Sequence, residues 1–455
     1  NKLILNTYKF IDTLINKENK YNSLIDFLEK KFPNIEGIKD GEKIIQSNDF
    51  IKEIPRIISN LNNSYIYIQG PPGTGKTYQA SNAIIELLKQ KKKIAITALS
   101  HKVIHNLLQK VEDMAKEKHF KIIGYKRGNL EDEDTIFNGD FIKTHEKDPI
   151  FMNALKINDA GQIFAGTKYH LASSYYDNKI DYLFIDEAGQ LSLADLISIG
   201  NIAKNIVLIG DQNQLGQPIK GTHPNESGQS ILDYLLEGRD TIPENRGIFL
   251  NKTYRLHSKI NEFISSNFYE GRLNCDERTD KRIIKFNKKC IIQKPGVHYI
   301  EMNHKNNVQT SLEEIETVVD LMKQMIGSEF NDNGKKRELN VKDFLIISPY
   351  NTQVNLMISK LEEEKIKNPR VGTIDKFQGQ EAPINIISMT SSDSETLPRN
   401  KEFFFSKNRL NVAISRAQVA SIILFNPKIL DFFPKDISQI KLVNNFFKLL
   451  DYKVK

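Results

Sequence analysis

Cysteine and tryptophan are scarce in this chain of 455 residues, which has two cysteines, Cys275 and Cys290, and no tryptophan. Two cysteines are too few for a four-cysteine zinc or iron–sulfur site, and their scarcity is typical of proteins from a reducing cytosol. The sequence also has no run of eighteen apolar residues and no recognisable signal peptide. We therefore expect a soluble cytoplasmic protein without a membrane segment.

A large excess of charge of one sign is also missing. Lysine and arginine number 64 against 57 aspartates and glutamates, which leaves a net charge of +7, so any basic patch must be local. With 39% hydrophobic residues, the chain can bury two or three domain cores. The first residue is Asn1 and not methionine, and we expect the chain to be part of a longer protein.

The most specific pattern is a glycine-rich segment of the form G-x-x-x-x-G-K-T. It comprises Gly70, Pro71, Pro72, Gly73, Thr74, Gly75, Lys76 and Thr77. The apolar run 65–68 precedes it, and residues 78–89 follow with apolar residues at helical spacing, so the segment joins a strand to a helix. In this context backbone amides cradle phosphates, Lys76 reaches the β- and γ-phosphates, and Thr77 binds Mg²⁺. The pattern predicts a nucleoside triphosphatase, and a Gly/Pro turn before a surface helix is the alternative.

Two further polar segments follow apolar strands later in the chain. Asp186 and Glu187 come directly after the run 182–185. Asp186 is placed to hold Mg²⁺, and Glu187 is placed to orient or deprotonate the attacking water. Such a pair alone is usually a solvated turn, but downstream of a phosphate loop it is the expected second half of the site. Gln214 follows the strand 206–209 and is predicted to sense the γ-phosphate.

A series of ordered boxes resembles the motifs of superfamily 1 helicases. Beside the glycine-rich segment, the boxes are residues 186–190, 210–215, 254–257, 268–273, 371–381 and 410–417. The resemblance covers residues 65–425 and is to the branch that contains the RNA-surveillance helicase of nonsense-mediated decay and the nuclease–helicases of Okazaki-fragment processing. Within that branch the chain is most similar to the helicase half of bacterial RecB-type nuclease–helicase fusions. That narrower resemblance depends on two short segments, residues 100–102 and 221–224, which are less specific than the boxes above.

The resemblance implies an ATP-dependent helicase that moves 5′→3′ on single-stranded nucleic acid, with ATP and Mg²⁺ bound between two RecA-like lobes. It implies that Arg255 and Arg416 reach the γ-phosphate, where a guanidinium group can bind two oxygens at once. It further implies that Glu381 binds the ribose and that Tyr254 stacks on the base, although Tyr254 could equally belong to the core.

One departure from the family concerns adenine. The family usually carries a glutamine upstream of the phosphate loop that recognises this base. Gln46 and Gln69 are the nearby candidates here, and neither fits the pattern. ATP is the default cofactor, and its discrimination from GTP stays open.

Strands and helices alternate in two successive stretches, as in parallel doubly wound sheets. The strand candidates are 65–68, 93–97, 162–166, 182–186, 206–209, 296–300, 344–348, 370–373, 384–389 and 421–425. We predict an α/β protein with an N-terminal helical segment (1–43), two tandem RecA-like P-loop NTPase domains (44–246 and 247–435) and a C-terminal helix (436–455). The polar stretch 112–159 interrupts the first domain and is assigned as a small accessory insertion, with a long loop as the alternative.

Nucleic acid is expected at the carboxyl ends of the strands in both domains, where hydroxyls, amides and a few cations suit sequence-independent phosphate contacts. The candidates are Ser100, His101, Lys102, Thr167 and Lys168 in the first domain and Pro349, Tyr350 and Thr373 in the second. Tyr350 could stack on a base, whereas His101 could simply cap the next helix.

The sequence leaves two questions open: whether the protein acts on DNA or RNA, and whether it unwinds duplexes. The likeness to RecB-type fusions favours DNA, but an RNA helicase of the same branch and an ATP-gated clamp that does not unwind fit the same residues. We find no Asp…Glu-x-Lys nuclease pattern outside the ATPase boxes. A nuclease would therefore belong to a missing region or to a partner.

Overall fold

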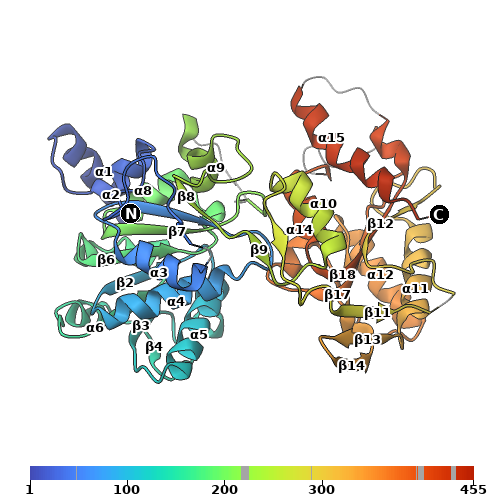
Figure 1. The fold of residues 1–455 in the computed structure, drawn as a ribbon, viewed down its shortest axis with the longest axis horizontal. Coiled ribbons are helices and arrows are strands. Elements are labelled where there is room, and N and C mark those ends of the chain that lie inside the picture. The colour runs from blue at the N-terminus through green and yellow to red at the C-terminus, as the bar shows by residue number, and fades with distance from the viewer. Residues whose placement is uncertain are drawn as a thin grey trace. The chain divides into compact units, whose positions relative to one another are not determined.

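The structure, a computed structural model, describes residues 1–47, 49–216, 225–287, 289–395, 397, 404–431 and 437–454, without the side chains of 437–439, 441 and 442. Contacts divide the chain into two compact units. The first comprises Asn1–Gly70, Gly75–Gln212 and Gly216–Leu250, and the second comprises Pro71–Thr74, Asn213–Leu215 and Asn251–Lys455. Each unit contains its own parallel sheet (Figure 1), which confirms the predicted α/β fold with two tandem RecA-like domains.

The first unit contains an eight-stranded parallel sheet. Its strands are β1 (Tyr65–Gln69), β2 (Lys93–Thr97), β3 (Ile123–Arg127), β4 (Ile142–His145), β5 (Gln162–Ala165), β6 (Ile180–Ile185), β7 (Ala203–Gly210) and β8 (Gly247–Phe249), in the order β4-β3-β5-β2-β6-β7-β1-β8. The central strands are runs of apolar residues buried on both faces, as a parallel sheet between helices requires. Because every pairing is parallel, the carboxyl ends of all eight strands meet at one edge.

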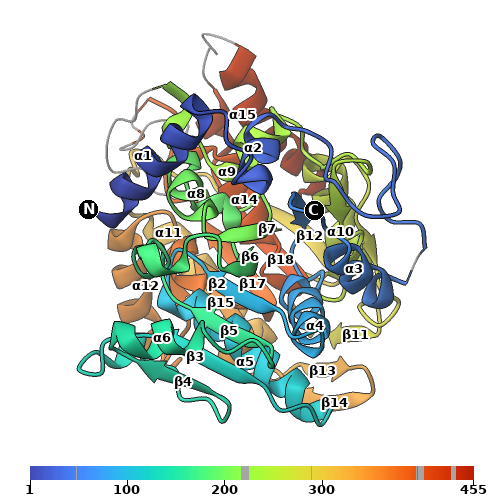
Figure 2. The ribbon, with the colours of Figure 1, turned by 90° about the vertical axis from the view of Figure 1, so that its left-hand side faces the viewer.

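Helices cover both faces of this sheet (Figure 2). They are α1 (Lys2–Ile15), α2 (Asn22–Leu28), α3 (Phe50–Ser59), α4 (Lys76–Lys89), α5 (His101–Glu117), α6 (Asp148–Ala154), α7 (Lys168–Leu171), α8 (Leu193–Gly200) and α9 (Ile231–Leu236). Successive side chains of β1 point to opposite faces of the sheet and pack against the helices on each face. Ile66 and Ile68 join the core under α3, α4 and α5, whereas Tyr65 packs edge-on against Phe27 of α2 on the opposite face.

The stretch predicted to be an accessory insertion, residues 112–159, is part of the first sheet. Residues up to Glu117 complete α5, and β3 and β4 join the sheet beside β5. The buried carboxylate of Glu112 accepts hydrogen bonds from the amides of residues 140–142, which fastens the start of β4 to α5. The segment therefore widens the sheet by two strands and does not form a separate subdomain. The boundary at residue 247 also differs from the prediction, because β8 pairs with β1 in the first unit.

The second unit contains a five-stranded parallel sheet in the order β12-β18-β17-β15-β16 and a three-stranded antiparallel sheet in the order β11-β13-β14. Its strands are β9 (Lys252–Thr253), β10 (Asn274–Cys275), β11 (Arg282–Lys285), β12 (Gly296–Glu301), β13 (Glu329–Asp332), β14 (Lys335–Glu338), β15 (Phe344–Ile347), β16 (Val371–Gly372), β17 (Ala382–Ser388) and β18 (Ala417–Phe425). β13 and β14 form a hairpin with Asn333 and Gly334 between the two strands.

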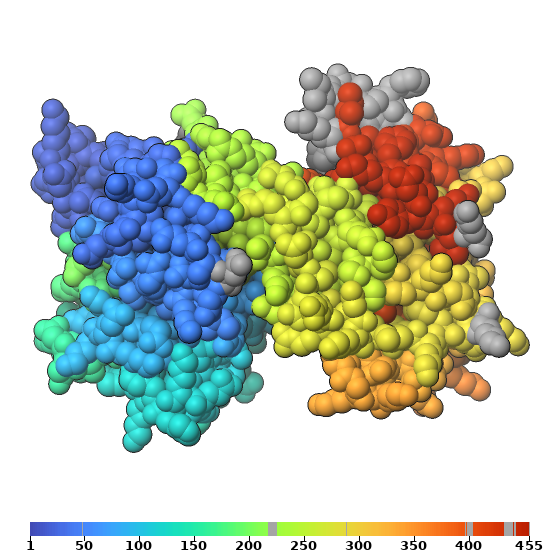
Figure 3. Space-filling view, viewed as in Figure 1, coloured from blue at the N-terminus to red at the C-terminus, as the bar shows by residue number. Residues whose placement is uncertain are grey.

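The helices of the second unit are α10 (Ser258–Phe268), α11 (Leu312–Met325), α12 (Asn351–Glu363), α14 (Lys407–Ile414) and α15 (Ile437–Leu449). The apolar faces of α11 and α12 form one core with the parallel sheet, and α10 packs against β12, β18 and α14. In Figure 3 the covering side chains hide most of the strands that the ribbon reveals. Among the described residues, no helix is long and apolar enough to span a membrane.

Candidate nucleotide and nucleic-acid sites

The glycine-rich loop runs from the end of β1 into the first turn of α4. Gly73 and Gly75 adopt left-handed backbone conformations, with φ of 74° and 81°, which glycine tolerates best. Gly75 is the N-cap of α4 and offers no side-chain acceptor, so the first helical turn presents its amides to an anion. The Lys76 ammonium donates a 2.7 Å hydrogen bond to the carbonyl of Gly70. This arrangement fits a bound triphosphate.

Asp186 and Glu187 follow β6 at the same edge of the sheet. Burial and the neighbouring Glu187 charge raise the pKa of Asp186 to about 7, and the charge of Lys76 opposes this rise. The positive charge of Lys76 therefore lies near enough to the Asp186 carboxyl group to influence its pKa. Glu187 adopts a left-handed conformation (φ 49°, ψ 46°), which is uncommon for a residue with a side chain. Backbone strain of this kind is concentrated at functional sites.

The donor atoms at this edge suit Mg²⁺. This ion prefers oxygen ligands and is usually held by one or two protein groups together with water and substrate phosphates. The Asp186 carboxylate and the hydroxyl of Thr77, which lies in the first turn of α4, are such groups. Within the described ranges, no three His, Cys, Asp or Glu side chains gather into a self-sufficient metal site. The residues thus fit a cation whose coordination the nucleotide completes.

Both predicted arginine fingers belong to the second unit, where they lie close to Glu381. The Arg255 Nε forms an ion pair with Glu381 Oε2, and Arg255 Nη1 donates to the carbonyl of Ser415 at 3.4 Å. Arg416 is buried and donates from Nη1 to the carbonyl of Gln380 at 3.4 Å. Burial alone would raise the pKa of Glu381, but the charge and hydrogen bond of Arg255 outweigh it and hold that pKa below its usual range.

Tyr254 and the loop residues 71–74 lie together in the second unit. The Tyr254 amide donates to the carbonyl of Gly73 at 2.8 Å, and a Cβ on Gly73 would lie 2.4 Å from the Cβ of Arg255. Only glycine fits here. The Tyr254 side chain is 45% exposed, with the Arg278 guanidinium 5.2 Å from its ring centroid. Tyr254 is therefore not a core residue, and its ring can meet a ligand.

Gln214 follows Asn213, a residue of the second unit that is hydrogen-bonded to two other segments. The side chain of its neighbour Asn213 donates to the carbonyl of Phe268 at 2.7 Å, and the carbonyl of Asn213 accepts from Asn411 at the same distance. Asn411 belongs to α14 and lies within the predicted box 410–417. The segment that carries Gln214 is thus fixed to α10 and α14.

Gln69, a nearby candidate for recognising adenine, has a structural role. Its buried amide group donates to the carbonyl of Asp240 at 3.0 Å and accepts from the amide of Ile242 at 2.7 Å. The Gln69 side chain is therefore already engaged within the fold. Gln46 is exposed.

The residues of the first unit that are predicted to contact nucleic acid lie at the carboxyl ends of β2 and β5. Ser100, and not His101, is the N-cap of α5, since its hydroxyl accepts from the amide of Val103. Thr167 begins α7 without using its side chain as a cap, and Lys102 is exposed. Lys168 forms a 2.6 Å ion pair with Asp195 and is largely buried. Ser100, His101, Lys102 and Thr167 thus share one edge, whereas the Lys168 charge is already paired.

A buried lysine beside His101 was missed by sequence analysis. Lys126 is fully buried and donates to His101 Nδ1 at 2.8 Å and to the carbonyls of Arg127 and Thr135. Burial lowers the pKa of Lys126 to about 8, and burial together with this charge lowers the pKa of His101. Since Nδ1 accepts from an ammonium, the network assigns the imidazole proton to Nε2. His101 is then a neutral donor at the edge of a cavity of about 410 Å³ that Thr167 also lines.

His170, in the same loop region, gives the fold a pH dependence. It is 7% exposed, and burial lowers its pKa to about 3. Between pH 6.5 and 3 the unfolded chain binds a proton here that the folded chain does not, so stability falls as pH falls through this window. We expect a loss of about 2 kcal/mol between pH 6.5 and 5.

Urea unfolding at pH 7.5 and 5.0 measures this loss. The His170→Gln variant should lose that part of the pH dependence, whereas His119→Gln, at an exposed histidine, should keep it. An unchanged pH dependence in His170→Gln would contradict the assignment.

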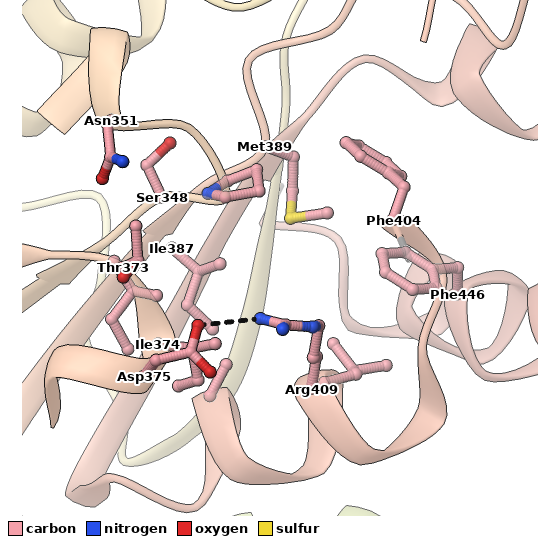
Figure 4. A pocket seen from close by; sticks show the side chains of 14 residues that line it. Ser348, Asn351, Thr373, Ile374, Asp375, Ile387, Met389, Phe404, Arg409 and Phe446 are labelled. Carbon is pink, nitrogen blue, oxygen red and sulfur yellow. Dashed lines mark hydrogen bonds and ion pairs between the residues drawn. The ribbon is translucent and has the colours of Figure 1, made fainter. Parts of the chain in front are cut away.

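In the second unit, Pro349 and Thr373 lie at the carboxyl ends of β15 and β16 and line a common pocket (Figure 4). Tyr350 is only 4% exposed. The base-stacking role predicted for Tyr350 therefore does not fit, because its ring is part of the core. The softer signal at residues 221–224 lies outside the described residues.

Comparisons with known proteins agree with this geometry. Two sequence profiles, each described as an AAA domain, match residues 55–219 and 228–428. The chain is 28% identical to the DNA replication ATP-dependent helicase/nuclease dna2 of Schizosaccharomyces pombe over 85% of its length and 28% of that protein. It is 24% identical to the DNA polymerase alpha-associated DNA helicase A of Saccharomyces cerevisiae (93% and 73%) and to the ATP-dependent helicase upf1 of S. pombe (89% and 47%).

The fold and the phosphate loop define a P-loop protein with two RecA-like domains. The two profiles, the relatives and the ordered boxes place it in superfamily 1 of the helicases. The chain spans 28% of the dna2 protein and about half of upf1, so it corresponds to part of those proteins. The narrower likeness to RecB-type fusions stays a prediction.

Proposed function

We propose that this chain hydrolyses ATP to move along single-stranded nucleic acid and to unwind duplexes, with DNA as the preferred strand. The observation that carries the proposal is the phosphate loop and Asp186 at one edge of a parallel sheet, where Lys76 and Asp186 interact electrostatically. Two of the relatives described above are named as DNA enzymes, which supports DNA.

The residues have separate roles in this proposal. Lys76 holds the β- and γ-phosphates, while Thr77 and Asp186 hold Mg²⁺. Glu187 accepts the proton of the attacking water. Arg255 and Arg416 bind the γ-phosphate, and Gln214 reports its presence. Tyr254 stacks on the adenine, and Glu381 either binds the ribose or releases Arg255 when ATP enters.

The proposed contacts with nucleic acid are groups at the carboxyl-end edges of the two parallel sheets. They are Ser100, His101, Lys102 and Thr167 in the first unit and Pro349 and Thr373 in the second. Hydroxyls and a neutral imidazole N–H bind phosphates without reading sequence. A change of grip between the two edges with each ATP cycle would give 5′→3′ stepping.

The first experiment is an ATPase assay with no polynucleotide, with single-stranded DNA and with RNA of the same length. We expect strong stimulation by DNA. Stimulation by RNA alone would identify an RNA motor, and no stimulation by either would contradict the strand contacts. Duplexes with 5′ or 3′ tails then separate a 5′→3′ helicase from a clamp, because a clamp hydrolyses ATP without unwinding either substrate. Labelled strands incubated with Mg²⁺ reveal any nuclease activity.

A further inference from the structure

Helix α1 presents large apolar side chains to water on the outside of the first unit (Figure 1). They are Ile4, Leu5, Tyr8, Ile11, Leu14 and Ile15, and between 40% and 72% of each residue is exposed. Single exposed apolar residues are common on protein surfaces, but a contiguous group of six marks a surface that meets a partner. We call these six residues the α1 stripe.

The opposite face of α1 is fastened to the first unit by polar contacts as well as by an aromatic ring. The buried Asn6 side chain donates to two backbone carbonyls, one at the end of α7 and one in α8, at 3.2 and 3.1 Å. Lys9 forms an ion pair of 2.7 Å with Asp177. The ring of Phe10 is buried and lies 6.2 Å from that of Tyr21. These contacts hold α1 in the orientation that leaves the α1 stripe in water.

The spacing within the α1 stripe is that of a seam between two helices. Its central residues are Ile4, Tyr8, Ile11 and Ile15, which alternate at intervals of four, three and four residues, as the apolar positions of a heptad do. At about 100° per residue they fall within an arc of roughly 60° on the helix. Such a seam matches a second copy of itself that runs in the opposite direction. Ile4 then lies against Ile15 of the second copy. Tyr8 likewise lies against Ile11, and no charged side chain enters the seam.

We infer that two copies of this chain associate through their α1 helices, paired antiparallel about a twofold axis. At roughly 100 Å² of exposed surface for each side chain of the α1 stripe, the pairing removes on the order of 1,000 Å² from water, near the lower limit of specific interfaces. The dimer is therefore reversible, with an expected dissociation constant of about 10 µM. The inference does not depend on the proposed function, because no residue of the α1 stripe belongs to the nucleotide or nucleic-acid sites.

Sedimentation velocity of the chain at concentrations from about 1 to 200 µM tests this inference. We expect a monomer–dimer equilibrium for the wild type. Ile11→Asp should raise the dissociation constant by at least about tenfold, because a charge in the seam loses its water without gaining a partner. Ile157→Asp is the matched control, since Ile157 is also 40% exposed and belongs to the first unit but lies outside α1. It should dimerise as the wild type does.

Disulfide trapping tests the antiparallel pairing itself. The variants Ile4→Cys and Ile15→Cys are oxidised separately and as a mixture, and we expect covalent dimers mainly from the mixture. Equal residues of the two helices would lie about 16 Å apart along the axis, whereas a disulfide joins Cα atoms about 4.4–6.8 Å apart. Oxidised wild-type protein measures any crosslinking through Cys275 and Cys290.

Three results would overturn the inference. The first is a wild-type chain that stays monomeric over the whole concentration range. The second is a dimer whose dissociation constant Ile11→Asp leaves unchanged. The third is a yield of disulfide dimers that is as high from Ile4→Cys or Ile15→Cys alone as from their mixture.

Discussion

Replacing Glu187 with glutamine is expected to lower the rate of ATP hydrolysis by about 10²- to 10⁴-fold while leaving ATP affinity nearly unchanged. The amide keeps the size of the side chain but cannot accept the proton of the attacking water. Lys76 and Asp186, which hold the phosphates and Mg²⁺ in our proposal, are untouched. Phosphate release gives the rate, and equilibrium binding of a fluorescent ATP analogue gives the affinity.

The control for this variant is available in the same chain. Glu237 also has a left-handed backbone (φ 52°), and its side chain is 55% exposed. Because both glutamates adopt the same backbone conformation, Glu237→Gln separates the chemistry of the carboxylate from any effect on the turn. Retained hydrolysis in Glu187→Gln would assign the base to another group.

Replacing Arg416 with lysine is expected to lower the hydrolysis rate by about 10³-fold, the lower end of what an arginine finger contributes. Lysine keeps the positive charge, but it lacks the planar pair of donors that binds two phosphate oxygens together. ATP affinity should change much less than the rate, because an arginine finger binds the redistributed charge of the transition state more strongly than it binds ground-state ATP. Single-turnover hydrolysis measures the chemical step directly.

Arg56→Lys is the matched control, since Arg56 is an exposed arginine of α3 paired with Glu53. It should hydrolyse ATP at the wild-type rate. If Arg416→Lys were as active as this control, Arg416 would be a structural residue that supports the loop at Gln380.

Most strands of the two parallel sheets could be predicted from the sequence because their signals are local. Runs such as 65–68 and 206–209 are apolar throughout, and their positions in the structure differ from the predicted ones by only a few residues at each end. The phosphate loop could also be predicted, since glycine, lysine and threonine at this fixed spacing are typical of a site for phosphate and Mg²⁺. In both cases the residues that determine the local structure are neighbours in the sequence.

The features that escaped prediction depend on partners distant in the sequence. β3 and β4 are short and partly polar, and they are strands only because β5 and the Glu112 carboxylate hold them. No local pattern marks Lys126 as buried, because its contact with His101 forms only when β3 joins the sheet. The pocket that Pro349 and Thr373 line draws its walls from five separate segments (347–351, 373–375, 387–389, 404–413 and 446), so no single motif predicts it.

In the proposed function, β3 and β4 increase the length of nucleic acid that the first unit would cover. Neighbouring strands in a sheet lie about 4.8 Å apart, so β3 and β4 lengthen the edge at which we propose that nucleic acid binds by about 10 Å beyond β5. Arg127 and His145 stand at the carboxyl ends of these strands, beyond Thr167. A strand laid along this edge would be shielded from a nuclease over a longer stretch than the edge from β2 to β5 alone could protect.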